Sequence, residues 1–358
     1  MNKGHSKYST DESEEENDNI RLNENSLNCY DEYQEGYTSI LDKLDNEALD
    51  ENFEIEPDTL TIIKAIGRGH FSDVHMGILS LLTKRIPVAV KTTHMRTYSM
   101  NAVESEDILG RQREMLRDEL RMFAHLQSSS AGGHENILKL LGAITTIETD
   151  FCLVTEYCEC GSLDCFLQAK WKNGDFEDEL VFEGNENEKV WKIQRVSDWG
   201  KNYQSRRDKG LITTSDLLWF ALQIARAMQF LASMNVIHRD IALRSILLKS
   251  DFTVKVAGFG LSRKLKECDD AYYTESKDAP LPIRQTAPES LKSGQFAITS
   301  EYWSFGVVIW ELFTFAEKQP YSVELDDYEM NGKLYEILVE HLLSGQRLSI
   351  PNNVPQQM

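Results

Sequence analysis

The segment that most constrains how this 358-residue chain can fold lies at residues 236–248 and reads VIHRDIALRSILL. Its charged residues stand between short apolar runs, and it follows a stretch whose apolar residues recur at helical spacing. These apolar positions are Leu217, Phe220, Ala221, Ile224, Met228 and Leu231. Few folds combine a buried helix with a loop of this kind, so this segment narrows the choice of architecture more than composition does.

Two motifs nearer the N-terminus carry residue types that suit phosphate binding. Residues 66–74 read IGRGHFSDV. Gly67 and Gly69 would let backbone N–H groups approach phosphate oxygens, although such a glycine pair is more often an ordinary tight turn. Lys91 ends a valine-rich run, and Glu119 lies in the next expected helix. Taken alone, this lysine and glutamate would form a surface salt bridge worth about 0 to 1 kcal/mol.

The order of these motifs along the chain resembles the catalytic domain of protein kinases. Residues 151–158, FCLVTEYC, resemble the strand and hinge between kinase lobes, and residues 254–263, VKVAGFGLSR, resemble the strand and turn that open the activation loop. Ala242 and Arg244 are typical of tyrosine kinases, as are the LPIR and APE motifs within residues 281–289. By motif, the chain is most similar to the receptor tyrosine kinases.

The resemblance implies an α+β, two-lobed protein-kinase fold with a small β-rich N-lobe and a larger, mostly helical C-lobe. We expect an acidic disordered tail at residues 1–55, the N-lobe at 56–157 and the C-lobe at 158–358. A polar segment at 168–212 resembles the kinase insert of receptor tyrosine kinases, and its tryptophans would either anchor a partner or pack back onto the lobe. The C-lobe is expected to be incomplete, because a kinase would continue into further helices beyond Met358.

The resemblance also implies roles for individual residues. Asp240 stands where a kinase places the carboxylate that accepts the proton of the substrate hydroxyl, and Arg244 belongs to the same catalytic set. Lys91 would hold the nucleotide phosphates, with Glu119 as its helix partner. The residues expected to bind ATP through the glycine-rich loop, the adenine pocket, the gatekeeper and the hinge are Gly67, Gly69, Phe71, Val74, Ala89, Lys91, Thr155, Glu156 and Cys158.

Two replacements would remove the metal chemistry of such a site. Gly258 stands where the resemblance places the metal-binding aspartate, and Ser245 replaces the asparagine that would bind a second magnesium ion. Loss of one charge-stabilising group typically lowers a rate by about 10² to 10³. These degenerate positions predict impaired catalysis and argue against bound Mg²⁺, unless Asp240 itself holds a metal. ATP binding stays compatible with Lys91, Glu119 and the hinge.

Further positions around this site depart from the kinase pattern. Gln285 and Thr286 replace the aromatic and aliphatic residues usual before the APE motif, and Glu301 replaces the aspartate at the start of the next helix. Glu289 would lack its usual arginine partner, and as a buried unpaired charge it would cost about 3 to 5 kcal/mol. Three rings are expected to stack through the core as they do in kinases: Phe123, His238 and Phe259.

The formal charge of −20 is concentrated in the N-terminal tail, since residues 1–55 carry sixteen acidic and four basic side chains. This acidity argues against nucleic acid or an anionic membrane as a partner. The resemblance implies signalling proteins or another tyrosine kinase as partners. The longest apolar stretches, such as residues 305–315, are too short to span a membrane. We therefore expect a cytoplasmic chain, or one at the cytosolic face of a membrane if it is part of a receptor-type product.

Three hypotheses for the function follow. The leading one is a tyrosine-kinase-like pseudokinase that acts in signalling through partner binding. The second is a weak protein tyrosine kinase that transfers the γ-phosphoryl group of ATP with Asp240 as the base. The third is an adaptor phosphorylated by another kinase, although tail tyrosines are also found in linkers without any such role. The tyrosines concerned are Tyr30, Tyr33, Tyr37, Tyr272 and Tyr273.

Overall fold

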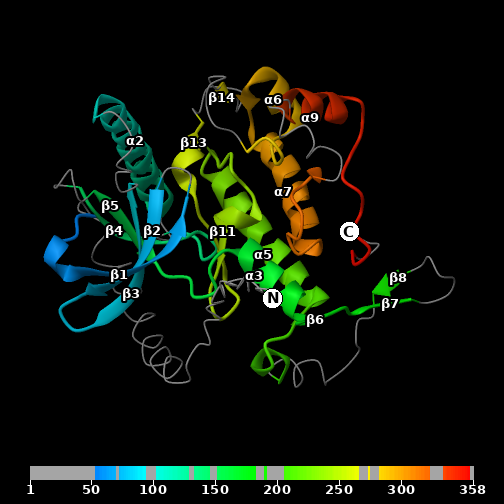
Figure 1. Cartoon of the computed structure of the whole chain (residues 1–358), viewed down its shortest axis with the longest axis horizontal. Helices are drawn as coiled ribbons and strands as arrows, with labels where there is room; N and C mark the ends of the chain where they lie inside the picture. The colour runs from blue at the N-terminus through cyan, green and yellow to red at the C-terminus, as the bar shows by residue number, and fades with distance from the viewer. Residues whose placement is uncertain are drawn as a thin grey trace, which may run out of the picture.

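The chain folds into two lobes, a β-sheet crossed by one long helix and a group of helices beside it (Figure 1). The computed structural model describes residues 53–69, 72–93, 102–128, 133–145, 151–182, 189–191, 205–265, 273–274, 282–322 and 334–354. Within these residues the predicted two-lobed α+β fold is confirmed.

The N-lobe sheet is antiparallel, with the strand order β1-β2-β3-β5-β4. Its elements are β1 (Leu60–Arg68), β2 (Ser72–Ser80), β3 (Arg85–Thr93), β4 (Leu140–Ile144) and β5 (Cys152–Glu156), with α2 (Ala102–Gln127) as the long helix. Leu116 and Phe123 of α2 pack with Leu153 on one face of the sheet. Val88 and Val90 belong to a second apolar cluster. Because neighbouring residues of a strand point to opposite faces, these valines turn Lys91 toward α2.

The C-lobe is mostly helical. Its helices are α3 (Leu163–Asn173), α5 (Thr214–Ser233), α6 (Pro288–Ser293), α7 (Ile298–Phe313) and α9 (Leu334–Leu343). The helical periodicity read from the sequence is confirmed in α5, where Leu217, Phe220 and Ile224 are completely buried. Thr213 and Asp216 form a capping box that begins this helix, because they satisfy N–H groups that have no partner inside the helix.

The connections between these helices contain short strands and single 3-10 turns. Their strands pair as β6–β9, β7–β8, β10–β13, β11–β12 and β14–β15. Their bounds are β6 Phe176–Glu177, β7 Leu180–Phe182, β8 Lys189–Trp191, β9 Ile212–Thr213, β10 Val236–Ile237, β11 Ile246–Leu248, β12 Val254–Val256, β13 Arg263–Lys264, β14 Tyr273–Thr274, β15 Gln295–Phe296, η3 Leu243–Ser245 and η4 Phe259–Leu261. A further 3-10 turn, η1 (Pro57–Thr59), precedes β1 in the N-lobe. The β11–β12 hairpin brings the loop that contains Asp240 next to the turn at Gly258.

The prediction of disorder throughout residues 1–55 is wrong at its last positions. Phe53 and Ile55 run along the free edge of β4, where the Ile55 N–H donates to Ala143 O at 2.8 Å and the Ala143 N–H donates to Phe53 O at 2.6 Å. The Glu54 carboxylate accepts from the N–H and the hydroxyl of Thr145. Two apolar side chains and a paired carboxylate therefore order this segment, which acidity alone did not indicate.

Two other expectations about the C-lobe are corrected. Helix α3 continues to Asn173, inside the range expected for the insert, and ends where Gly174 adopts a left-handed conformation. Trp171 stacks on Phe315 with 4.6 Å between ring centroids, so it packs back onto the lobe. Glu289 lies exposed at the start of α6, so the expected penalty for a buried unpaired charge does not arise.

Candidate active site

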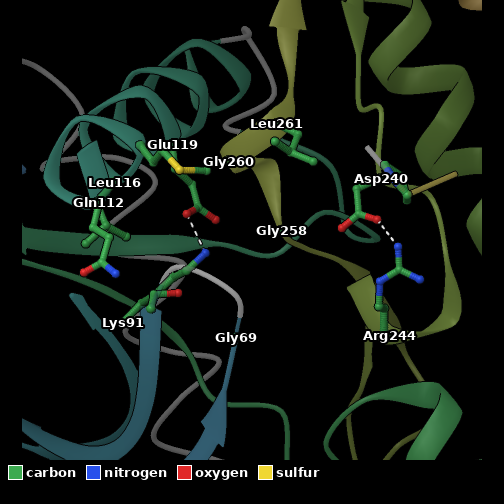
Figure 2. A pocket seen from close by; sticks show the side chains of 13 residues that line it. Gly69, Lys91, Gln112, Leu116, Glu119, Asp240, Arg244, Gly258, Gly260 and Leu261 are labelled. Atoms are coloured by element: carbon green, nitrogen blue, oxygen red, sulfur yellow. Dashed lines mark hydrogen bonds and ion pairs between the residues drawn. The ribbon is translucent and has the colours of Figure 1, made fainter. Parts of the chain in front are cut away.

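Lys91 and Glu119 meet between the sheet and α2, as the resemblance implied. Lys91 Nζ donates to Glu119 Oε2 at 2.6 Å. The Glu119 side chain is only 4% exposed and that of Lys91 26%, so water screens this pair less than a surface salt bridge. Figure 2 shows the two side chains pointing toward each other from helix and strand. The ion pair therefore fixes α2 against the sheet in the arrangement that phosphate binding by a kinase lysine requires.

The three rings expected to stack through the core do so. Phe259 packs between Phe123 of α2 and His238, with centroid distances of 5.2 Å and 5.0 Å. His238 accepts from the N–H of Asp240 at Nδ1, and its Nε2 lies 2.9 Å from Ala257 O. Burial lowers the pKa of His238, so the neutral ring donates from Nε2 and accepts at Nδ1. These contacts join the helix of the N-lobe to the loops of the C-lobe.

Both oxygens of the Asp240 carboxylate are bound within the protein. Arg244 pairs with Oδ1, and Ser245 Oγ donates to Oδ2 at 2.9 Å. Figure 2 shows Asp240 and Arg244 facing each other at the edge of the cavity. The serine hydroxyl, which stands in the place of a magnesium ligand, is thus used to hold Asp240. This arrangement leaves the carboxylate fewer free lone pairs for a substrate hydroxyl or for a metal ion.

Gly258 supplies no side chain at the point where the resemblance calls for a carboxylate. It has φ +80°, a left-handed conformation that glycine adopts without strain and that aspartate tolerates better than most residues. A Cβ atom built there would lie 3.5 Å from Ser245 Oγ, which is ordinary contact. A Cβ atom at position 258 would therefore meet no clash, although a side chain there would carry the strain of the left-handed backbone, and the carboxylate itself is absent.

The residues at positions 245 and 258 do not fit a pair of magnesium ions. Magnesium prefers carboxylate oxygens, and Gly258 has none, while the hydroxyl of Ser245 is bonded to Asp240. Among the described residues, no cluster of three or more His, Cys, Asp or Glu side chains could hold a metal ion. Lys91, which is held by Glu119 at the wall of the cavity, is a residue that could bind a phosphate group.

That cavity has a volume of about 310 Å³ and lies between α2, the glycine-rich turn and the Gly258 turn. It brings together six predicted site residues: Gly69, Lys91, Glu119, Asp240, Arg244 and Gly258. The adenine-side residues do not line it, but the sheet register places them beside it. Val74 is opposite Lys91, and Ala89 is opposite Thr155. Gly67 is opposite Val74.

The hinge residues have their own contacts. Thr155 and Cys158 are buried, and burial raises the pKa of the Cys158 thiol well above its usual value, which keeps it a neutral thiol. The Glu156 carboxylate is paired with Lys255 Nζ at 2.9 Å and accepts from the Lys139 N–H. The hinge side chains are thus used for packing and for ion pairing.

Glu301 anchors the loop that carries Asp240, although it is longer than the aspartate usual there. Its carboxylate accepts from the backbone N–H groups of His238 and Arg239 at 3.1 Å and 3.0 Å. Burial raises the pKa of Glu301 to about 7, against the opposing effect of those two N–H groups. Glu311 accepts from the Leu243 N–H and from the Gln285 amide. Although positions 285 and 301 depart from the kinase pattern, their side chains still take part in the hydrogen bonds that anchor the Asp240 loop.

Several predicted residues lie outside the described part of the chain. They are Phe71, Tyr30, Tyr33, Tyr37 and Tyr272. Tyr273 lies in strand β14, which pairs with β15, and the structure describes only its backbone. Their proposed roles in nucleotide binding and regulation stay predictions.

Sequence reasoning missed two polar side chains of the cavity wall and one ion pair. Gln112 lies seven residues before Glu119 and lines the same cavity with Ser72. The seven-residue spacing, which places two residues on one face of a helix, is a signal that could have identified Gln112. Lys255 stands between two buried valines of β12, but nothing in that short strand indicates its pairing with Glu156.

The described geometry agrees with what the chain is similar to. A family model described as "Protein tyrosine and serine/threonine kinase" matches residues 60–358. The chain therefore belongs to this family of protein kinases.

The similar curated proteins include several tyrosine kinases of receptor type. Receptor-like tyrosine-protein kinase kin-15 of Caenorhabditis elegans is 33% identical over 321 residues, which cover 87% of this chain and 61% of that protein. Tyrosine-protein kinase receptor old-1 of the same organism is 32% identical, with coverage of 83% and 52%. Vascular endothelial growth factor receptor 3 of Danio rerio is 29% identical, with coverage of 86% and 22%. The chain spans less than two thirds of the length of each of these relatives. The resemblance to a receptor-type tyrosine kinase catalytic domain is thereby confirmed.

In the part of the chain that the structure describes, no helix combines the length and the apolar character needed to cross a membrane.

Proposed function

We propose that the chain is a tyrosine-kinase-like pseudokinase, which acts in signalling through contacts of its kinase fold and holds ATP as a ligand without using it as a phosphoryl donor. The single observation that carries this proposal is that the Asp240 carboxylate is already bound within the protein. Its two oxygens are bound by Arg244 and Ser245, and the neighbouring metal position is Gly258. In phosphoryl transfer the protein mainly positions groups and neutralises charge through metal ions, so a kinase site without metal ligands loses its largest electrostatic contribution.

The chain keeps the packing contacts of a kinase domain while it lacks the metal ligands, and this contrast supports a role in binding partners. The ion pair of Lys91 and Glu119 holds α2 against the N-lobe sheet, and the stack of Phe259 on Phe123 and His238 joins the lobes. Retained packing without metal ligands maintains a shape that partners can recognise. Signalling proteins of the kinds that bind kinase domains are the proposed partners.

One observation favours the second candidate, a weak protein tyrosine kinase. The Lys91–Glu119 pair is formed at 2.6 Å, and in active kinases this pair must be in place for transfer. A kinase with an unconventional metal ligand would use the same lysine and the same docked helix. The two candidates therefore differ in chemistry and share their fold.

Phosphoryl transfer from radiolabelled ATP to a tyrosine-containing polymer separates the two candidates. The purified chain is measured with Mg²⁺ and then with Mn²⁺, beside Asp240→Asn. We expect no incorporation that depends on Asp240. Incorporation that Asp240→Asn abolishes would establish the kinase and reject the pseudokinase.

A repair series locates the defect in the metal ligands. Gly258→Asp adds the missing carboxylate, and Ser245→Asn combined with it removes the hydroxyl that holds Asp240 and restores an amide ligand. We expect the double variant to raise transfer by at least about 10²-fold over the wild type. Adding Asp240→Asn to the double variant should abolish that gain. Thermal unfolding of each variant verifies that it is folded.

A further inference from the structure

A second cavity, on the N-lobe, is a groove lined mostly by apolar side chains. It has a volume of about 370 Å³ and lies between the segment before β1, the turn that joins β2 to β3 and the start of β4. Its apolar side chains are Phe53, Ile55, Leu79, Leu81, Leu82, Leu140 and Leu141. Ile55, Leu81 and Leu141 are only partly buried, so apolar surface is open to solvent in the groove. Apolar surface gathered in one place in this way marks a contact site.

Leu82 projects from the β2–β3 turn at the wall of this groove. The Leu81 N–H donates to Lys84 O at 2.8 Å and the Lys84 N–H donates to Leu81 O at 3.3 Å, so Leu82 and Thr83 form a two-residue hairpin loop. Such loops favour Asn, Asp and Gly, and the Leu82 side chain is fully exposed, with a relative exposure of 107%. It therefore serves neither the turn nor the core. A single exposed leucine is common on protein surfaces, and the apolar groove beside it is what distinguishes Leu82.

Charges of opposite sign stand on the two segments that border the groove. Glu56 and Asp58 are exposed at the 3-10 turn η1, and Lys84 and Arg85 are exposed where the hairpin enters β3. Figure 1 shows η1, in blue, and the β2–β3 turn at the end of the N-lobe that lies away from the helices of the C-lobe. The chain thus presents an apolar groove, a projecting leucine, an acidic segment and a basic segment on one surface.

A surface with these four features is complementary to a second copy of itself. In a contact with two-fold symmetry every pair of residues meets twice, so Leu82 of each copy would enter the groove of the other. Because Leu82 belongs to the groove wall, the leucine and the groove both lie near the symmetry axis, and the two insertions are compatible. The acidic segment of each copy then faces the basic segment of the other, which favours this pairing over one that opposes like charges.

We propose that this surface, formed by the apolar groove, Leu82 and the two charged segments, binds a second copy of the chain in a symmetric dimer. The inference goes beyond the proposed function and does not depend on it, because the cavity that contains Lys91 and Asp240 has a different lining. The dimer is compatible with either candidate function and leaves that cavity outside the contact.

Sedimentation velocity of the full chain over a series of concentrations tests this proposal. We expect a monomer–dimer equilibrium for the wild type. Leu82→Ser should raise the dissociation constant at least about tenfold, because each dimer loses two buried leucine side chains. Leu343→Ser changes another exposed leucine, at the end of α9, and should leave the dissociation constant unchanged. A wild type that stays monomeric, or a dimer that Leu82→Ser does not weaken, would overturn the proposal.

Charge reversal tests the pairing of the two segments and its symmetry. One variant combines Glu56→Lys with Asp58→Lys, and the other combines Lys84→Glu with Arg85→Glu. Each variant opposes like charges at both contacts, so each alone should dimerise at least about tenfold more weakly than the wild type. An equimolar mixture should form a heterodimer with the affinity of the wild type, because opposite charges face each other again at both contacts. A mixture as weak as the separate variants would overturn the proposed pairing, and thermal unfolding verifies that every variant is folded.

Discussion

Glu301 illustrates how one buried side chain holds a loop together. Its two carboxylate oxygens accept from the N–H groups of His238 and Arg239, which would otherwise be buried donors without partners. The same burial that makes these hydrogen bonds necessary penalises the charge of the carboxylate and raises its pKa to about 7. The loop that carries Asp240 is therefore anchored by a group that titrates near neutral pH.

We predict that Glu301 makes the stability of the fold depend on pH. The pKa of Glu301 in the folded chain is about 7, above its usual value of 4.5. Between these two values the folded state binds more protons than the unfolded state, so the free energy of unfolding falls as the pH rises from 4.5 to 7. Chemical denaturation of the wild type and of Glu301→Gln at pH 5 and pH 7.5 measures this. The wild type should lose about 2 kcal/mol more than the variant, and identical pH profiles would contradict the prediction.

At the scale of elements, the edge of β4 is covered by the segment that precedes the N-lobe. Phe53 and Ile55 exchange backbone hydrogen bonds with Ala143, and this close approach requires a residue without a side chain at Gly142. A Cβ atom at Gly142 would lie 2.5 Å from Ile55 Cγ1 and 2.8 Å from Phe53 O. The glycine of β4 thus permits the N-terminal segment to dock.

We predict that Gly142→Ala displaces this segment from β4. Overpacking of this kind costs about 1 to 3 kcal/mol, and the segment can relieve it by detaching from the edge of β4. Hydrogen exchange of the peptides that contain residues 53–56 should become faster, with little change in α5.

Gly110→Ala serves as the control for this prediction. Gly110 lies in α2, and a Cβ atom there would meet nothing within 4 Å. The control should leave exchange at residues 53–56 unchanged. If Gly142→Ala left the hydrogen exchange of residues 53–56 unchanged, the close approach of Gly142 to this segment would not be what holds it on β4.

At the scale of the whole molecule, the contacts that join the lobes include an aromatic stack and a buried ion pair. The stack runs through Phe259, and the ion pair links Glu156 of β5 to Lys255 of β12. The side chains of this pair are 1% and 11% exposed. It lies next to the hinge, so the N-lobe sheet and a C-lobe hairpin are coupled where the chain crosses between them.

We predict that Lys255→Met destabilises the fold by about 3 to 5 kcal/mol, because it leaves the Glu156 charge buried without its partner. The double variant Glu156→Gln/Lys255→Met should recover much of that loss, since no charge is then buried. Urea unfolding measures both variants. Arg121→Met breaks the exposed ion pairs of Arg121 with Glu114 and Asp118 and should change the stability by less than about 1 kcal/mol. Additive losses in the double variant would contradict a direct pairing.

Much of the site could be predicted from the sequence because its motifs are local. The pairing of Lys91 with Glu119 follows from a strand and a helix that the motif order identifies, and Asp240 and Arg244 are four residues apart. Other contacts could not be predicted, since they join segments that are distant in the chain. Nothing local shows that Lys255 would meet Glu156.

The sequence by itself determined the family, the helical face of α5 and the missing metal ligands, because these depend on residue identity and short-range spacing. Only the tertiary structure decided which groups are buried. It left Glu289 exposed, it buried Glu301 at the backbone of the Asp240 loop, and it left the amide of Gln112 facing a cavity. Burial is a property of packing between distant segments, and it sets both the ionisation of a side chain and its need for a partner.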